Sequence, residues 1–138
     1  MYVNGIGFLT SIGYPLYYRK TQHVSDGKTE TLYKALDKIL RIYNSRGFWV
    51  DTINCDNGFR VMMDDVKDEL DCNMCYTNAQ DHEPGAEQNN RTIKNQVRVG
   101  LHRSTYRTMP RTMLQHLIIT STEKLNNFPA TKRRVRPL

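Results

Sequence analysis

Residues 48–58 read FWVDTINCDNG, and this stretch decides the fold more than any other. Residues 48–55 are rich in β-branched and aromatic side chains, which favours a short strand. The DNG triplet at 56–58 is typical of a turn. The sequence therefore predicts a strand whose carboxyl end delivers Asp56 to the edge of a sheet, where α/β proteins place their chemistry.

The segment before this strand predicts a meander of strands followed by a helix. Residues 1–23 hold short runs of Tyr, Val, Ile, Phe and Thr broken by glycines and other turn residues, so we expect two or three antiparallel strands. Ser25 or Asp26 can then cap a helix that Gly47 ends. The inward face of this helix is marked by Leu32, Leu36, Ile39, Leu40 and Tyr43. A strand that follows such a crossover helix is expected to join the meander in parallel.

Helical patterns dominate the rest of the chain. A short helix is marked by Met62, Val66 and Leu70. Residues 72–77 favour another strand, and a long helix begins near Gly85. The inward positions of the long helix are Ala86, Asn90, Ile93, Val97 and Leu101. A last helix follows Pro110 and ends before Phe128. Its inward positions are Leu114, Leu117, Ile118, Ser121 and Leu125.

The order of these elements predicts a mixed α/β (α+β) fold. A length of 138 residues suits one compact domain. We expect residues 1–130 to form a central mixed sheet of about five strands flanked by helices, and 131–138 to form a basic tail. No apolar run approaches the ~18 residues of a membrane span, so no membrane partner is expected. The odd number of cysteines, 3, favours a reducing compartment.

Positive charge is concentrated in the C-terminal part of the chain. The net charge is +6, but residues 1–85 carry 9 Lys and Arg against 12 Asp and Glu, whereas residues 86–138 carry 11 against 2. A field of positive sign attracts polyanions, of which nucleic acid is the commonest inside cells. The distribution therefore favours nucleic-acid binding over an ordinary solvated surface, in which both signs are interspersed.

One face of the long helix combines a carboxylate with a row of cations. Glu87, Arg91, Lys94 and Arg98 are spaced i, i+4, i+7 and i+11. If Asp56 and Glu87 met at the sheet edge, they could hold one or two Mg²⁺ ions, and the cations could bind the phosphates of a nucleic acid. An amphipathic helix with a surface ion pair between Glu87 and Arg91 explains the same spacing. The residues alone leave both interpretations open.

Three stretches of the chain resemble the catalytic core of a retroelement integrase, closest to those of copia-type retrotransposons. They are NCDNGF (54–59), YTNAQDHEPGAEQNNRTIKNQVR (76–98) and MLQHLIITSTEKLNNFPA (113–130). The specific parts are the aspartate with its turn at 56–58 and the H-x-P-G-x-E loop at 82–87, which opens a helix rich in Asn and basic residues. The remainder matches in pattern only.

The resemblance implies a ribonuclease-H-like fold and an enzyme that joins element DNA to host DNA. The family uses two aspartates and a glutamate to bind Mg²⁺ or Mn²⁺, and the resemblance makes Asp56 the second aspartate and Glu87 the glutamate. The helix positions that contact DNA ends and flanking phosphates in such enzymes are matched by Asn90, Arg91 and Lys94, with Arg98 extending the row. The implied partners are the element ends and target DNA, with a homo-oligomer in the complete enzyme. The implied location is the nucleus or a cytoplasmic particle of a eukaryotic host.

The chain departs from this family at both ends. The family's first aspartate lies just before the segment that matches residues 1–4, and no acid occurs before Asp26. Residues 131–138 depart from the Gly-rich continuation expected in such elements. We therefore expect a partial catalytic core with a truncated first strand, inactive alone.

Two other functions fit parts of the sequence. The first is a non-catalytic DNA- or RNA-binding domain. Its binding surface would consist of Arg91, Lys94, Arg98, Arg103 and Arg107. The second is an active nuclease of similar fold, which would need a third metal-facing acid that the pattern does not supply. The first of these stays open as the alternative to an integrase core.

Overall fold

The computed structural model describes residues 1–14, 16–76 and 84–128 of the chain. In chain order its elements are β1 (Tyr2–Val3), β2 (Ile6–Gly13), β3 (Tyr18–Val24), α1 (Thr29–Ser45), β4 (Thr52–Cys55), the 3₁₀ helix η1 (Asn57–Met62), α2 (Met63–Leu70), β5 (Asn73–Tyr76), α3 (Pro84–Arg103) and α4 (Arg111–Asn127). The expected basic tail at 131–138 and the first two residues of the H-x-P-G-x-E loop, 82–83, lie outside the described residues. The chain therefore has the predicted mixed α+β class.

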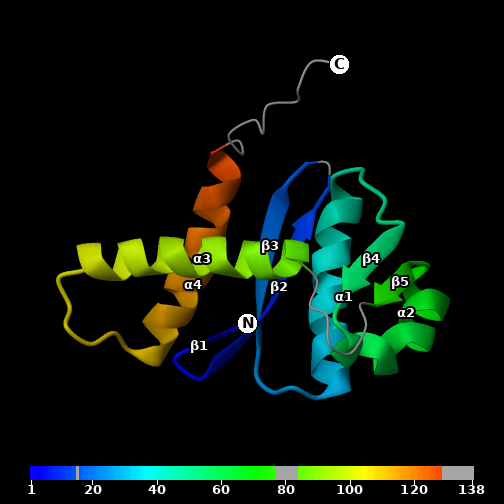
Figure 1. The fold of residues 1–138 in the computed structure, drawn as a ribbon, viewed down its shortest axis with the longest axis horizontal. Coiled ribbons are helices and arrows are strands. Elements are labelled where there is room, and N and C mark those ends of the chain that lie inside the picture. Colours follow the sequence, from blue (N-terminus) through cyan, green and yellow to red (C-terminus); the bar gives the residue numbers. More distant parts are fainter. Residues whose placement is uncertain (15, 77–83, 129–138) are drawn as a thin grey trace.

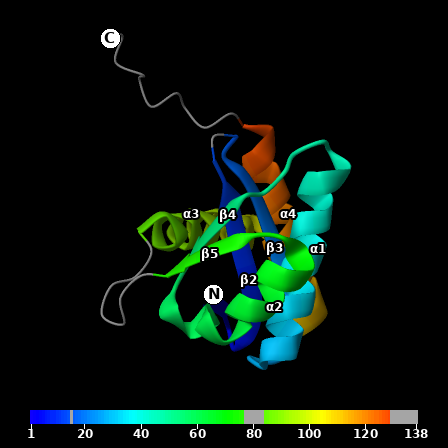
Figure 2. The same cartoon turned by 90° about the vertical axis from the view of Figure 1, so that its right-hand side faces the viewer.

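The elements form three layers, and the sheet that contains β2 is the middle one (Figure 1). Helices α3 and α4 cover one face of this sheet, and α1 lies against the other face together with α2, β4 and β5 (Figure 2). Within the described residues, no helix is both long enough and apolar enough to cross a membrane.

Strands β1, β2 and β3 form the predicted antiparallel meander, in that order across the sheet. Asn4 and Gly5 connect the first two strands, and both have positive φ, 49° and 77°. Two consecutive residues with positive φ are typical of a type I′ turn, whose twist matches that of paired strands. The turn sets the register in which Val3 lies opposite Ile6. An Asn-Gly pair thus defines the first hairpin.

The strand that precedes Asp56 pairs differently from the prediction. The five described strands lie in two sheets rather than in one, because β4 pairs in parallel with β5 and not with the meander. Strand β1 is two residues long and offers little edge to another strand. Strand β4 also begins only at Thr52, because the Phe48 N–H closes the end of α1 by donating to the Tyr43 carbonyl at 3.0 Å. The prediction of a parallel strand was right, but its partner was wrong.

Helix α1 begins later than the sequence predicted. Its N-cap is Lys28, not Ser25 or Asp26. Asp26 instead accepts the Lys28 N–H at 3.0 Å in a turn before the helix. Hydrogen bonds from the Thr31 side chain and then from the Lys28 backbone lower the pKa of Asp26. The predicted end of the helix is confirmed, since Gly47 follows it with a φ of 80°.

Strand β2 separates two apolar clusters because successive side chains of a strand point to opposite faces. The cluster beneath α3 and α4 consists of Ile6, Phe8, Ile93, Val97, Leu114 and Ile118. The cluster beneath α1 and α2 consists of Leu36, Leu40, Met62, Val66, Cys72 and Met74, with Leu9 of β2 packed against it. Helices α3 and α4 begin beside Gly85 and directly after Pro110, as predicted. Half of the predicted inward positions of these helices are buried, namely Ile93, Val97, Leu114, Ile118 and Ser121. The others are half-buried, namely Ala86, Asn90, Leu101, Leu117 and Leu125.

Polar side chains tie α3 and α4 to the sheet. The buried hydroxyl groups of Thr21 and Thr122 share a hydrogen bond of 2.8 Å. The Arg19 Nε donates to the buried Asn89 Oδ1 at 3.0 Å. The Asn126 side-chain amide binds both backbone groups of Arg19, accepting from its N–H and donating to its carbonyl, each at 2.7 Å. Because each of these polar groups has a hydrogen-bond partner, the bonds favour one packing of α3 and α4 against the sheet.

Tyr43 makes the fold sensitive to alkaline pH. Its ring is buried between α1 and β3, and its hydroxyl donates to the Tyr18 carbonyl at 3.0 Å. Burial, followed by the neighbouring Tyr18, raises the pKa of Tyr43 from 10.0 to about 12. The folded state therefore holds the proton more tightly than the unfolded chain, and this contribution to stability is lost as the pH rises from 10 to 12. The loss amounts to roughly 2–3 kcal/mol.

We expect urea unfolding followed by circular dichroism to show this loss for the native chain. The variant Tyr43→Phe should start less stable, because the hydrogen bond is gone, and should lose less stability between pH 10 and 12. Tyr106→Phe removes an exposed hydroxyl and serves as the control. Equal losses in Tyr43→Phe and in the native chain would show that Tyr43 does not cause the alkaline instability.

Candidate functional site

Asp56 occupies the position that the sequence predicted, directly after β4. Its carbonyl accepts the Phe59 N–H at 3.1 Å, which opens η1 and turns the chain away from the sheet. The residue is half-buried. The strand therefore holds the Asp56 backbone in place from one side and the 3₁₀ helix holds it from the other.

Three chain segments converge around this position. Strands β4 and β5 are parallel, so their carboxyl ends lie at the same end of the two-stranded sheet. The N-terminal end of α3 lies on the same side of the molecule as these strand ends (Figure 2). Carboxyl ends of parallel strands and N-termini of helices are where α/β folds collect functional groups. The topology thus creates a site from residues far apart in the sequence.

The Met1 amino group identifies two side chains of this site. It donates to the Phe8 carbonyl at 3.0 Å. Burial and then repulsion by Lys94 lower the pKa of the Met1 amino group, whereas attraction to Asp56 raises it. Asp56 and Lys94 therefore both lie within electrostatic range of one point. The meeting of Asp56 with Glu87, which the sequence analysis required, stays a prediction.

Glu87 lies in the first turn of α3 and is exposed. A carboxylate in this position interacts favourably with the helix dipole. Seven residues separate it from Lys94, which corresponds to roughly 10 Å along the helix axis. Glu87 and Arg91 both lie within the described residues 84–128, and they form no ion pair with each other. The interpretation of this face as a simple salt-bridged helix is thereby weakened.

The basic face of α3 (Arg91, Lys94 and Arg98) is accessible. Arg91 and Arg98 are exposed and Lys94 is half-buried. The Arg98 Nη1 donates to Asn95 Oδ1 of the same helix at 3.2 Å, which leaves the guanidinium at the surface. Three cations on consecutive turns of one helix can follow a phosphate backbone.

Two adjacent asparagines of α3 have structural contacts. Asn90 Oδ1 accepts a hydrogen bond from the Thr10 hydroxyl of β2. The contact of Asn90 with DNA, which the resemblance implies, stays a prediction. Asn89 was not singled out from the sequence, yet it is the buried one and binds Arg19. Its spacing four residues before Ile93 is the signal that could have identified it.

The two candidate carboxylates fit a hard divalent cation. Carboxylate oxygens with water and phosphate completing the shell are what Mg²⁺ prefers, and Mn²⁺ accepts the same ligands. Across residues 1–14, 16–76 and 84–128, the structure contains no group of three His, Cys, Asp or Glu side chains placed to hold a metal ion. A metal ion held by Asp56 and Glu87 stays a prediction.

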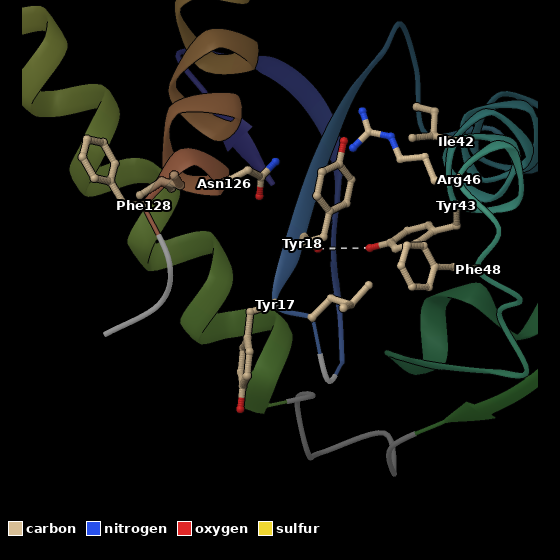
Figure 3. Close-up of a pocket in the computed structure, with 10 residues that line it drawn as sticks. Tyr17, Tyr18, Ile42, Tyr43, Arg46, Phe48, Asn126 and Phe128 are labelled. Atoms are coloured by element: carbon tan, nitrogen blue, oxygen red, sulfur yellow. Dashed lines mark hydrogen bonds between the residues drawn. The ribbon is translucent and has the colours of Figure 1, made fainter. Parts of the chain in front are cut away.

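A second concave surface lies away from this site and was missed by the sequence analysis. It is a cavity of about 270 Å³ at the end of the molecule where α1 and α4 finish, beside the hairpin of β2 and β3 (Figures 1 and 3). The aromatic stretches around residues 14–18 and 48–49 were interpreted only as strand and turn material. Their concentration of rings is the signal that could have identified a surface feature.

Neither a protein-family model nor a curated protein matches this chain. The similarity to copia-type integrases consequently depends on the motifs around Asp56 and Glu87. The functional interpretation below is built from the geometry of these residues.

Proposed function

We propose that this chain forms part of a ribonuclease-H-like integrase catalytic core of the copia type. In this proposal the chain binds DNA, and in the complete enzyme it takes part in metal-dependent strand joining. One observation carries the proposal: Asp56 directly follows a strand of a parallel pair, at the end of the sheet where α/β folds place their functional groups. A carboxylate at a strand end, together with the phosphate-binding cations of α3, is the combination that phosphoryl transfer needs.

The order of the elements supports the fold part of this proposal. An antiparallel meander is followed by helix α1, and the next strand, β4, ends directly before the candidate aspartate. The helix that carries the candidate glutamate, α3, follows β5 and packs on the opposite face of the meander from α1.

The proposed roles follow from chemistry and exposure. Asp56 and Glu87 would hold Mg²⁺ or Mn²⁺, which when bound would activate a water or 3′-hydroxyl and stabilise the leaving oxygen. Arg91 and Arg98, both exposed, would bind phosphates that flank the reacting one. Lys94, which is half-buried, would position the phosphate closest to the carboxylates. Because the chain matches two of the three carboxylates that the family uses, we expect it to bind DNA without joining it.

A second candidate function is a non-catalytic nucleic-acid-binding domain. It is favoured by the continuity of exposed cations beyond the candidate site, since Arg103 ends α3 and Arg107 follows it, both exposed. Such a surface would bind phosphates without any help from carboxylates. The two functions therefore differ in what Asp56 and Glu87 do.

Titration with Mn²⁺ separates the two functions. If the carboxylates bind metal, Asp56→Asn and Glu87→Gln should each weaken Mn²⁺ binding on the order of tenfold or more, because a charged oxygen ligand is lost. Neither variant should weaken binding to duplex DNA, since a negative charge near the phosphates has been removed. Isothermal titration calorimetry measures the first quantity and fluorescence anisotropy the second.

Asp51→Asn is the matched control for this titration. Asp51 is exposed and precedes β4, so this variant removes another aspartate carboxylate, at the opposite end of the same strand. We expect this variant to bind Mn²⁺ like the native chain. Equal Mn²⁺ affinity in the native chain and in both site variants would reject the metal site and favour the non-catalytic domain.

A further inference from the structure

The cavity beside the β2 and β3 hairpin is an aromatic groove. It is lined by Leu16, Tyr17, Tyr18, Ile42, Tyr43, Arg46, Phe48, Leu125, Asn126 and Phe128. Tyr18 lies between the residues from the α1 side, among them Phe48, and the residues from α4, among them Phe128 (Figure 3). A volume of about 270 Å³ is just below the range typical of sites for whole small molecules. The groove therefore suits a single planar group.

The groove combines exposed rings with rings that pack against a neighbour. Phe48 is 46% exposed and Phe128 is 70% exposed, so both offer a face on which a base can stack. Tyr18 packs edge-to-face on the buried Tyr43, with ring centroids 5.6 Å apart. Tyr17 makes an edge-to-face contact with Tyr14, which lies outside the lining, at 5.1 Å.

The charge of the groove is positive. Arg46 is the one charged side chain among the ten lining residues, and none of the ten is acidic. Its Cζ lies 5.1 Å from the centroid of the Tyr18 ring, a cation–π distance that holds the guanidinium over an aromatic face. An arginine in this position can donate to a phosphate while its plane stays against a ring. The groove thus combines stacking surfaces with one anion-binding group.

The backbone at Tyr17 is unusual. Its φ is +57°, a left-handed conformation that is an outlier for a bulky side chain. Strain of this kind persists where the surrounding structure enforces it, and it is concentrated at binding sites. Here it directs an exposed aromatic residue to the wall of the groove.

We propose that this groove binds single-stranded nucleic acid, with one base stacked on Phe48 and an adjacent phosphate bound by Arg46, which lies on the same side of Tyr18 (Figure 3). Phe128, on the other side of Tyr18, offers an exposed ring to a further base. A single strand is required because the faces of its bases are free for stacking, whereas those of a duplex are occupied. A lining with one arginine and no acidic residue matches a polyanion. This site is distinct from the basic face of α3 and does not depend on metal binding at Asp56.

The test measures the affinity of fluorescein-labelled oligo-dT for the full chain by anisotropy. The double variant Phe48→Leu/Phe128→Leu should bind about 5- to 30-fold more weakly than the native chain, because base–ring stacking is lost. Arg46→Gln, which retains every ring, should also weaken binding and should reduce the salt dependence by one phosphate contact. Tyr106→Leu is the matched control, because its ring is 65% exposed and lies outside the groove.

The outcomes distinguish this proposal from the proposed function. Weaker oligo-dT binding in the groove variants supports the groove whether or not Asp56→Asn changes Mn²⁺ binding. Native affinity for oligo-dT in both groove variants overturns it, even if Arg91→Gln/Lys94→Gln still weakens duplex binding. If the ring variants instead abolish self-association in analytical ultracentrifugation while oligo-dT binding stays native, the groove is an interface between copies of the chain and the proposal is wrong. Native far-ultraviolet circular dichroism confirms that each variant is folded.

Discussion

Replacing Arg91 and Lys94 together by glutamine is expected to weaken binding to duplex DNA by roughly 10- to 100-fold at 0.1 M salt. Both residues lie on the basic face of α3, where Arg91 is exposed and Lys94 is half-buried. A cation that neutralises a phosphate releases condensed counterions, so each lost contact reduces the slope of log K against log salt by about 0.9. In the double variant, the slope of log K against log salt should therefore be smaller in magnitude by about 1.8. Anisotropy titrations over a series of salt concentrations measure both quantities.

The control for this experiment must change the net charge equally. Lys34→Gln/Lys67→Gln also removes two positive charges, from exposed positions on α1 and α2. We expect it to retain most of the native affinity and slope, because neither lysine lies on the basic face of α3. If the two double variants behaved alike, the general charge of the protein and not this face would determine DNA binding.

The substitution Ile93→Ala is expected to destabilise the fold by about 2–5 kcal/mol. Ile93 is 0% exposed and belongs to the cluster that packs α3 and α4 against β2. Its truncation removes apolar contacts and leaves a cavity that the neighbouring side chains cannot fully close. Since domains of this size are stable by only about 5–15 kcal/mol, the effect is large.

Urea unfolding measures this loss as a lower midpoint at an unchanged slope. Val99→Ala is the matched control on the same helix, because Val99 is 43% exposed and its truncation should change stability by less than about 0.5 kcal/mol. Similar midpoints for the two variants would contradict the placement of α3 on the sheet and would also remove the basis for the basic face.

Local patterns predicted the elements of this protein better than their pairing. Three features depend only on residues a few positions away in the sequence. They are the Asn4-Gly5 turn, the end of α1 at Gly47 and the start of α4 after Pro110. The choice of β5 as the partner of β4 does not depend on such residues, because backbone hydrogen bonds between distant strands leave no local mark in the sequence. The strand before Asp56 was therefore predicted correctly while its sheet was not.

The same distinction applies to the functional surfaces. The helical spacing of Arg91, Lys94 and Arg98 placed them on one face, because that spacing alone determines the face. The pairing of Asp56 with Glu87 depended on the resemblance to a known family and stays a prediction. The aromatic groove could not be predicted from spacing, since its lining comes from the hairpin and from the ends of two helices.

The pairing of Asn126 with Arg19 has a consequence for solubility. Strand β3 binds β2 on one side, and on its other side the Arg19 N–H and carbonyl face α4. Unpaired backbone groups along the outer strand of a sheet are a template onto which another chain can add and begin to aggregate. The Asn126 amide occupies both groups at Arg19, as a neighbouring strand would, while the helix that carries it covers the strand. The Asn126 side chain thus blocks the addition of another strand at Arg19, near the start of β3.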